Sequence, residues 1–167
     1  MKRQIRLYNV IFPIWMLWLF PQVWLVALPA NLVIDCLVLL AVLKFRGHPQ
    51  KKTVLKQVWW KLWLLGFAAD FIGVAVLLPS LFLQSWLQGA VQIWAEEHLI
   101  PVLYNAFRSP WAFTWTLAAV VLAGVCIYFF DRRALRACSL LTHRDRHVIA
   151  LTLAIATAPW LFFIPAY

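Results

Sequence analysis

Charged residues are scarce in this chain. Asp, Glu, Lys and Arg make up 13% of its 167 residues, whereas a soluble globular domain carries about 25%. So few charges cannot cover the surface that a soluble domain of this length exposes to water. Hydrophobic residues make up 65% of the sequence, above the usual range of roughly 45–50%. The composition excludes an ordinary soluble domain and predicts an integral membrane protein.

Acidic residues and cysteines are also few. Six acidic residues against fifteen Lys and Arg give a formal net charge of +9. The basic residues lie in short clusters that flank apolar segments, so we interpret the charge as a topological signal and expect no nucleic-acid partner. Three cysteines, two of them inside apolar segments, exclude a disulfide framework.

Common enzyme motifs are absent. The sequence contains no Gly-rich phosphate loop, no Ser nucleophile elbow and no two-Cys metal knuckle. His143 and His147 have the spacing of two metal ligands on one helix face, but Arg144 and Arg146 beside them would repel a cation. The acidic and histidine side chains of Glu96–His98 diverge because neighbouring residues on a helix point about 100° apart. We therefore predict no catalytic residue, no metal site and no cofactor.

Long apolar segments are what the sequence has instead. Three predicted spans have the length of roughly 17–25 residues that a membrane helix needs; they lie at about Leu62–Leu83, Trp111–Phe130 and Val148–Tyr167. Each must be helical, because unpaired backbone groups are too costly in hydrocarbon. The predicted fold class is all-α: a polytopic helical membrane bundle that forms a single transmembrane domain over residues 1–167.

The N-terminal region predicts a helical hairpin. The 37 residues between Arg6 and Lys44 carry a single charge, that of Asp35. One straight helix of this length would measure about 55 Å, too long for a hydrocarbon core about 30 Å thick. Pro21 marks the best turn, because proline interrupts a helix. We predict a hairpin at about residues 5–43, whose first arm either crosses the membrane or is re-entrant.

The distribution of basic residues gives the predicted orientation. With the hairpin, fourteen of the fifteen Lys and Arg lie on the cytoplasmic side, and only Arg108 lies outside. If the N-terminal region crossed the membrane only once, three of these residues would move outside, which would leave eleven Lys and Arg on the cytoplasmic side and four outside. Because cytoplasmic loops are enriched in Lys and Arg, we predict about five segments in the cell membrane, with a cytoplasmic N-terminus and an extracytoplasmic C-terminus.

The connections between spans differ in character. Residues 44–61 form a cytoplasmic loop in which apolar residues recur at helical spacing from Lys51 onward. This pattern predicts an amphipathic helix that lies on the anionic inner leaflet. Residues 84–110 form an outer interfacial loop with a short surface helix that ends before Pro101. Residues 131–147 form a basic cytoplasmic loop.

Two carboxylates lie inside the predicted membrane segments. A carboxylate in hydrocarbon costs about 2.5–3.5 kcal/mol on insertion scales and usually faces the bundle interior. Asp35 lies nine residues before Lys44 and Asp70 nine residues after Lys61, so both are roughly 13 Å from the cytoplasmic boundary. Asn31 shares a helix face with Asp35. The pattern predicts a candidate intramembrane proton or cation site at Asp35, Asp70 and Asn31; the alternatives are a role in packing alone or in catalysis.

Small residues at helical spacing predict close helix contacts. On the span at about residues 62–83 they form a face of Gly66, Ala69 and Gly73. On the last span they form a face of Ala150, Ala154 and Ala158. Such faces let helix backbones approach one another in lipid. The sequence leaves open whether the partner helix belongs to the same chain or to another.

Three function classes remain. The leading hypothesis is a non-enzymatic membrane component that assembles with itself or with another membrane protein, since the chain has almost no soluble mass. The second is a small proton- or cation-conducting transporter or channel centred on Asp35 and Asp70. The third is an intramembrane enzyme that acts on lipid. Few polar residues lie along the spans and no nucleophile or metal set is present, which is why the first hypothesis leads.

Overall fold

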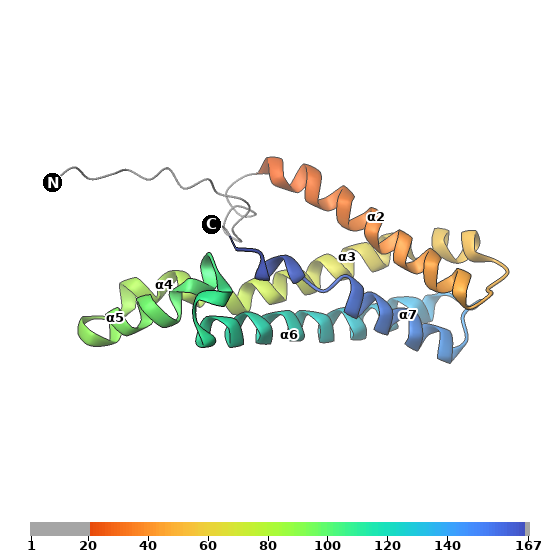
Figure 1. Cartoon of the computed structure of the whole chain (residues 1–167). Coiled ribbons are helices and arrows are strands. Elements are labelled where there is room, and N and C mark those ends of the chain that lie inside the picture. The colour runs from red at the N-terminus through yellow and green to blue at the C-terminus, as the bar shows by residue number, and fades with distance from the viewer. Residues whose placement is uncertain (1–20, 166–167) are drawn as a thin grey trace.

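The structure is a computed structural model that describes residues 21–165, and every regular element within that range is a helix (Figure 1). Four helices in this part are long and apolar enough to cross a membrane. Three of them correspond to α2 at Pro21–Phe45, α3 at Lys51–Leu77 and α6 at Pro110–Ala134, and the fourth extends from α7 at His143–Ala156 through the following 3₁₀ turn to Phe163. The predicted all-α membrane bundle is confirmed. The first arm of the predicted hairpin lies outside the described residues.

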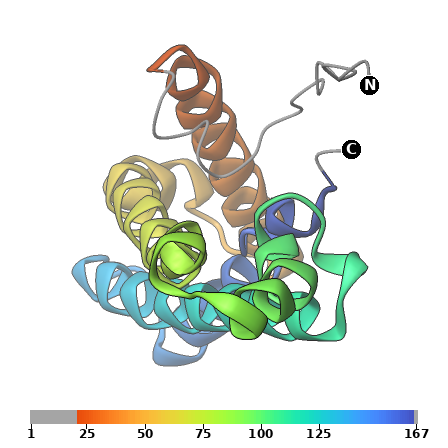
Figure 2. The same ribbon diagram turned by 90° about the vertical axis from the view of Figure 1, so that its left-hand side faces the viewer.

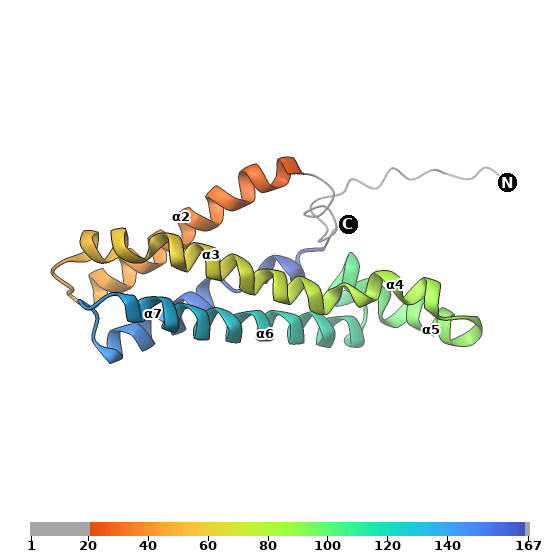
Figure 3. The ribbon, with the colours of Figure 1, turned by 180° about the vertical axis from the view of Figure 1, so that it is seen from behind.

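Short helices connect the long ones. Between α3 and α6 the chain forms α4 at Pro79–Trp86, α5 at Gly89–His98, and 3₁₀ turns at Ile100–Leu103 and Ala106–Arg108. Further 3₁₀ turns lie at Leu135–Ala137 and Trp160–Phe163. The helices α4 and α5 extend the bundle at one end, while the α2–α3 and α6–α7 connections lie together at the other (Figures 1 and 3). We call the latter the loop end and the former the α4–α5 end.

Local sequence signals account for the helix ends. Ser109 caps α6, since its side chain accepts a hydrogen bond from the backbone N–H of Trp111, and Pro110 occupies the first turn. Thr142 and Asp145 form a reciprocal capping box at the start of α7. Pro79 opens α4 directly after α3. The helices therefore begin at residues whose side chains accept hydrogen bonds from free backbone N–H groups, or at prolines, which have no backbone N–H.

The long helices pack in a defined order. The helix α6 packs along α3 and along α7, whereas α2 packs on α3 and α7 and diverges from the bundle toward its own N-terminal end (Figures 1 and 2). The main apolar core lies toward the loop end and includes Leu39, Leu43, Leu62, Ile127 and Leu153, each nearly inaccessible to solvent. All four long helices contribute to this core.

The segment predicted as a surface helix is the first part of α3. No break separates Lys51 from Leu77, because the sequence between them contains no proline and no helix-ending turn. Val54 and Val58 on its apolar stripe are fully buried, and they belong to the same core as residues of α2 and α7. Val54 and Val58 of the stripe therefore pack against protein, whereas Trp59 is exposed, as are the basic side chains of Lys52 and Lys56.

The loop predicted at residues 131–147 is also partly helical. The helix α6 continues to Ala134 and α7 begins at His143. The connection thus shortens to a few residues around one 3₁₀ turn.

The small residues predicted to mediate helix contacts do so within this chain. A Cβ atom added to Gly73 would lie 3.1 Å from the Cβ of Ala123 on α6, and one added to Gly66 would lie 3.7 Å from the Oδ2 of Asp35 on α2. Gly124 of α6 comes similarly close to the backbone oxygen of Ala154 on α7, at 3.5 Å. Ala69, Ala150 and Ala158 are buried as well. The stripe on α3 therefore contacts α2 and α6 of the same chain, and Ala154 of the other stripe contacts α6.

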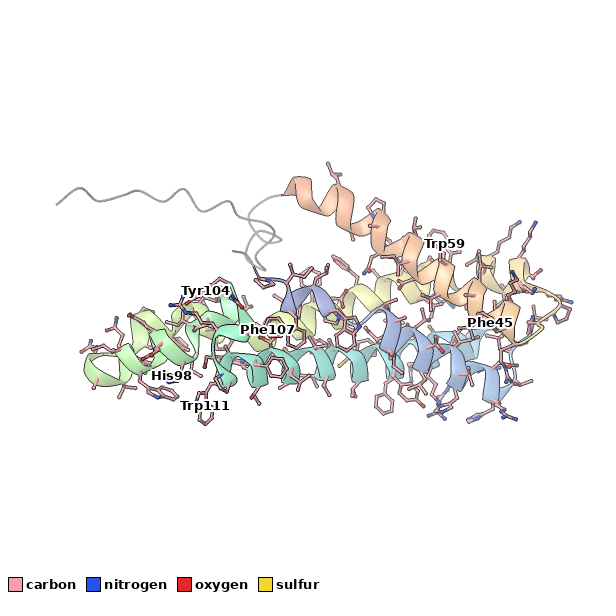
Figure 4. All side chains as sticks on the ribbon, in the orientation of Figure 1. Phe45, Trp59, His98, Tyr104, Phe107 and Trp111 are labelled. Atoms are coloured by element: carbon pink, nitrogen blue, oxygen red, sulfur yellow. The ribbon has the colours of Figure 1, made fainter. Side chains whose placement is uncertain are left out.

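Aromatic side chains gather at both ends of the bundle. Trp111, Phe107 and Tyr104 lie near the α4–α5 end, and Phe45 lies at the loop end (Figure 4). Trp94 of α5 stacks on His98 with ring centroids 5.0 Å apart and meets Trp111 edge-on at 6.0 Å. Aromatic residues at two levels of a helical bundle are typical of the two membrane–water interfaces.

Candidate functional site

Asp35 lies in the interior of the bundle. It projects from α2 between α3 and α7, with 6% of its surface exposed. Gly66 of α3 lies against its carboxyl group, and the side chain of Thr157, at the end of α7, lies on its other side. The absence of a side chain at Gly66 gives this carboxyl group its space.

Asp70 faces the same interface from α3. The side-chain amide of Asn31, one turn before Asp35 on α2, donates a hydrogen bond of 3.4 Å to the Oδ2 of Asp70. This bond is long, and the other carboxyl oxygen of Asp70 is buried without a hydrogen-bond partner. The carboxyl groups of Asp35 and Asp70 lie within electrostatic range of each other. The structure thus brings together the three residues that the sequence singled out.

Asp131 is a buried carboxylate that the sequence interpretation missed. It lies on α6 with 2% of its surface exposed, within electrostatic range of Asp35, and its Oδ1 has no hydrogen-bond partner. The predicted span ended at Phe130, which assigned Asp131 to a polar loop. The signal that could have found it is the helical spacing of the buried positions Val120, Ala123 and Ile127, which continues to Asp131.

No basic side chain among residues 21–165 forms an ion pair with these carboxylates. Within residues 21–165, the one salt bridge joins Arg46 to Asp145 with a distance of 2.8 Å, at the loop end. Uncompensated carboxylates inside a membrane bundle are expensive and usually mark a functional site. The three carboxylates therefore form one acidic centre, supplied by α2, α3 and α6.

Comparisons with protein-family models, with curated proteins and with solved structures find no match for this chain. The function must therefore be argued from the geometry.

The two other clusters that the sequence analysis considered contain His143 with His147 and Glu96–His98, and their histidines interact with neighbouring side chains. No three His, Cys, Asp or Glu side chains in the described part of the chain are arranged to hold a metal ion. His147 interacts with the Tyr128 hydroxyl at 2.8 Å, and His143 with the Arg132 guanidinium at 3.2 Å. On α5, His98 stacks on Trp94 and does not converge with the two glutamates before it.

The acidic centre is suited to proton exchange. A carboxyl group in an apolar environment loses its charge when it binds a proton, and the protonated form offers both a hydrogen-bond donor and an acceptor. Asn31 and Thr157 provide polar side chains beside Asp70 and Asp35, respectively. The centre therefore has several sites at which one proton can reside.

Proposed function

We propose that this chain is a small helical membrane protein that takes up and releases protons inside the bilayer, at a centre formed by Asp35, Asp70 and Asp131. One observation carries the proposal. The carboxyl groups of Asp70 on α3 and Asp131 on α6 lie within electrostatic range of the buried Asp35 on α2, and the described residues supply no basic partner for any of them. Proton relays in membrane proteins are built from such intramembrane carboxylates.

The three carboxylates lie at different depths along the bundle, so the equal depth that the sequence predicts for Asp35 and Asp70 is wrong: Asp35 is level with Gly66, and Asp70 is level with Asn31. Asp131 is three residues before the end of α6, about 5 Å from the loop end. Asp35 is ten residues before the end of α2, about 15 Å from that end. Asp70 pairs with Asn31, one further turn along α2. The centre therefore resembles a series of proton-binding steps leading from one membrane surface toward the middle of the bilayer.

A proton suits this centre better than a metal cation. Cations such as Ca²⁺ need at least six oxygen ligands, whereas a proton needs a single carboxyl oxygen. The described residues contain no group of three acidic, His or Cys side chains close enough to coordinate one ion. Proton transfer needs only transient approaches between neighbouring carboxyl groups.

The alternative of an assembly component has less support from the structure. The sequence supports it by the near absence of soluble mass, and by two small-residue faces whose partner helix the sequence leaves open. Gly73 is in contact with α6, and Ala154 with Gly124 of the same chain. Assembly with another protein stays a prediction.

Proton flux in reconstituted vesicles tests the proposal directly. The purified chain is placed in vesicles with an internal pH-sensitive dye, and a potassium gradient with valinomycin drives proton entry. We expect Asp35→Asn and Asp70→Asn to reduce the flux at least about tenfold, and Asp131→Asn to reduce it as well. Glu97→Gln is the matched control, because this residue is an exposed carboxylate on α5. Equal flux in wild type and in the folded Asp35→Asn and Asp70→Asn variants would contradict the proposal.

Carbodiimide labelling tests proton binding without any assumption about a transported substrate. An apolar carbodiimide reacts with protonated carboxyl groups and reaches those inside the bilayer. We expect a stoichiometric mass increase located by peptide mapping at Asp35, Asp70 or Asp131, with slower labelling at high pH. Modification confined to Glu96 and Glu97 would show that the acidic centre does not hold a proton.

A further inference from the structure

A groove runs along the outside of the bundle between α6 and α7. It has a volume of about 440 Å³. Its floor is formed by small residues, since Gly124, Ala154 and Ala158 leave no side chain large enough to fill the space. Its walls are larger apolar residues, which include Val121, Val125, Leu151 and Ile155. An apolar groove of this kind fits a hydrocarbon chain.

The length of the groove matches one leaflet of a bilayer. Along α6 its lining extends from Val120 to Phe129, nine residues or about 14 Å. Half of a hydrocarbon core about 30 Å thick is about 15 Å. Trp160 lies at the deep end, where its indole N–H donates a hydrogen bond of 2.9 Å to the backbone oxygen of Ile155. The groove therefore begins near the loop end and stops close to the middle of the membrane.

The shallow end of the groove is polar and basic. Tyr128 and His147 line it, and their side chains lie 2.8 Å apart. Arg132 donates a hydrogen bond of 3.2 Å to the Tyr128 hydroxyl, and its other terminal nitrogen lies 3.2 Å from the Nε2 of His143. These contacts hold the guanidinium group beside the mouth of the groove.

Arg132 has capacity for an anionic ligand. A guanidinium group carries five N–H donors, and the contacts with Tyr128 and His143 involve two of its nitrogens. Within the described residues, the one carboxylate in a salt bridge is Asp145, which pairs with Arg46. Phosphate oxygens are the partners that arginine binds best in such a position.

We infer that the α6–α7 groove binds an anionic phospholipid of the leaflet at the loop end. One acyl chain lies along the floor from Gly124 toward Trp160, and the phosphate group lies on Arg132 with His143 beside it. The proposal is independent of the acidic centre, because Asp35, Asp70 and Asp131 do not line this groove. The groove and the basic mouth together select an anionic lipid over a zwitterionic one.

Native mass spectrometry of the delipidated full chain tests the site. The chain in neutral detergent is titrated with phosphatidylglycerol, with phosphatidylcholine of the same acyl chains, and with glycerol 1-phosphate. We expect one phosphatidylglycerol to bind about tenfold more tightly than phosphatidylcholine, because the choline ammonium of the latter adds a positive charge beside Arg132 and offsets the attraction of its phosphate. Arg132→Gln should reduce this preference to about twofold or less. Arg136→Gln is the matched control, because it removes an exposed arginine at the same end.

A second variant tests the acyl-chain part of the site. Val121→Trp places a large side chain at an exposed wall of the groove and spares the packed floor. It should weaken the binding of both phospholipids.

The following outcomes would overturn the proposal. Equal binding of both phospholipids to wild type would mean that the mouth does not select charge. An equal loss of the phosphatidylglycerol preference in Arg136→Gln would mean that the anionic lipid is attracted by the overall positive charge of the loop end. Displacement of lipid by glycerol 1-phosphate at equal concentration would mean a phosphate site without an acyl chain. Dimers without bound lipid would assign the groove to a second copy of the chain. Lipid binding that appears only when residues 2–20 are removed would assign the groove to the N-terminal segment.

Discussion

Asp145 has two structural roles at the start of α7. Its Oδ1 accepts hydrogen bonds of 2.8 and 3.0 Å from Arg46, and its Oδ2 accepts bonds from the backbone and side chain of Thr142. The first set joins the two connections at the loop end, and the second caps the helix. One side chain thus fixes both the entry of α7 and its position against the end of α2.

Substitution of Asp145 should destabilise the fold more than substitution of Arg46. Asp145→Ala removes the ion pair and half of the capping box, about 1 kcal/mol each, so we expect a loss of about 2 kcal/mol. Arg46→Ala removes only the ion pair and should cost about 1 kcal/mol or less. Reversible unfolding in mixed micelles measures both losses. Asp145→Asn serves as the control that keeps a capping oxygen; a loss equal to that of Asp145→Ala would contradict a capping role.

Asn31 and Asp70 form a pair that a double-mutant cycle can isolate. Their hydrogen bond of 3.4 Å links α2 to α3, and interhelical bonds in membrane proteins average about 0.6 kcal/mol with a maximum near 1.7 kcal/mol. We expect a coupling free energy of about 0.6 kcal/mol between Asn31→Ala and Asp70→Ala, from unfolding of the two single variants and the double variant. Strictly additive effects would show that this bond does not stabilise the bundle.

Sequence reasoning found part of the acidic centre, for a definite reason. Asp35 and Asp70 stand out because each is an isolated charge deep within an apolar segment. Asp131 does not stand out, because Arg132 and Arg133 follow it directly and the run resembles a membrane flank. Recognition of Asp131 requires knowledge that α6 continues to Ala134. The contact between Asp35 and Thr157 depends on how α2 crosses α7, which no local pattern encodes.

At the scale of elements, two glycines on α3 offer a matched pair. A Cβ at Gly66 would make an ordinary contact of 3.7 Å with Asp35, whereas one at Gly73 would lie 3.1 Å from both Ala123 and Phe162. Ala123 is fixed on the backbone of α6, so it has little freedom to yield. Gly73 therefore sets how closely α3 and α6 approach, and Gly66 only leaves space beside a carboxyl group.

Alanine substitutions at these glycines should have opposite effects. We expect Gly66→Ala to be neutral or to stabilise the fold by up to about 1 kcal/mol, because alanine favours the helix. Gly73→Ala should destabilise it by about 1–3 kcal/mol through overpacking. Thermal unfolding of the two variants in the same detergent measures the difference. Equal stabilities would contradict the tight α3–α6 contact.

Element positions were predictable where composition changes sharply, and less so elsewhere. The predicted second arm of the hairpin agrees with α2 within a few residues, since Pro21 and the cluster after Lys44 mark its ends. The first turns of α3 were harder to interpret. Their apolar stripe has the same spacing whether it faces lipid or protein, and only the fold places Val54 and Val58 against the core.

For the whole molecule, the packing order of the helices creates its two candidate sites. The helix α2 leans on α3 and α7, which places Asp35 opposite Asp70 and Thr157 in the interior. The pairing of α6 with α7 over Gly124 and Ala154 leaves the groove on the outside. The small residues were visible in the sequence, but their assignment to one helix pair or another needed the fold.

The same architecture makes the predicted orientation testable at its two ends. Lys52 lies exposed near the loop end and Gln88 lies exposed between α4 and α5. Basic residues concentrate at the loop end, so the positive-inside rule predicts that this end faces the cytoplasm. We expect a cysteine at position 88 to react with a membrane-impermeant maleimide in intact cells, and one at position 52 to react only after permeabilisation. The native cysteines are first replaced by alanine. In a separate fusion, we expect a reporter attached at residue 1 to lie in the cytoplasm. If only position 52 is labelled in intact cells, the orientation is opposite to the predicted one. If the labelling is as expected but the reporter at residue 1 is external, the N-terminal segment does not return across the membrane.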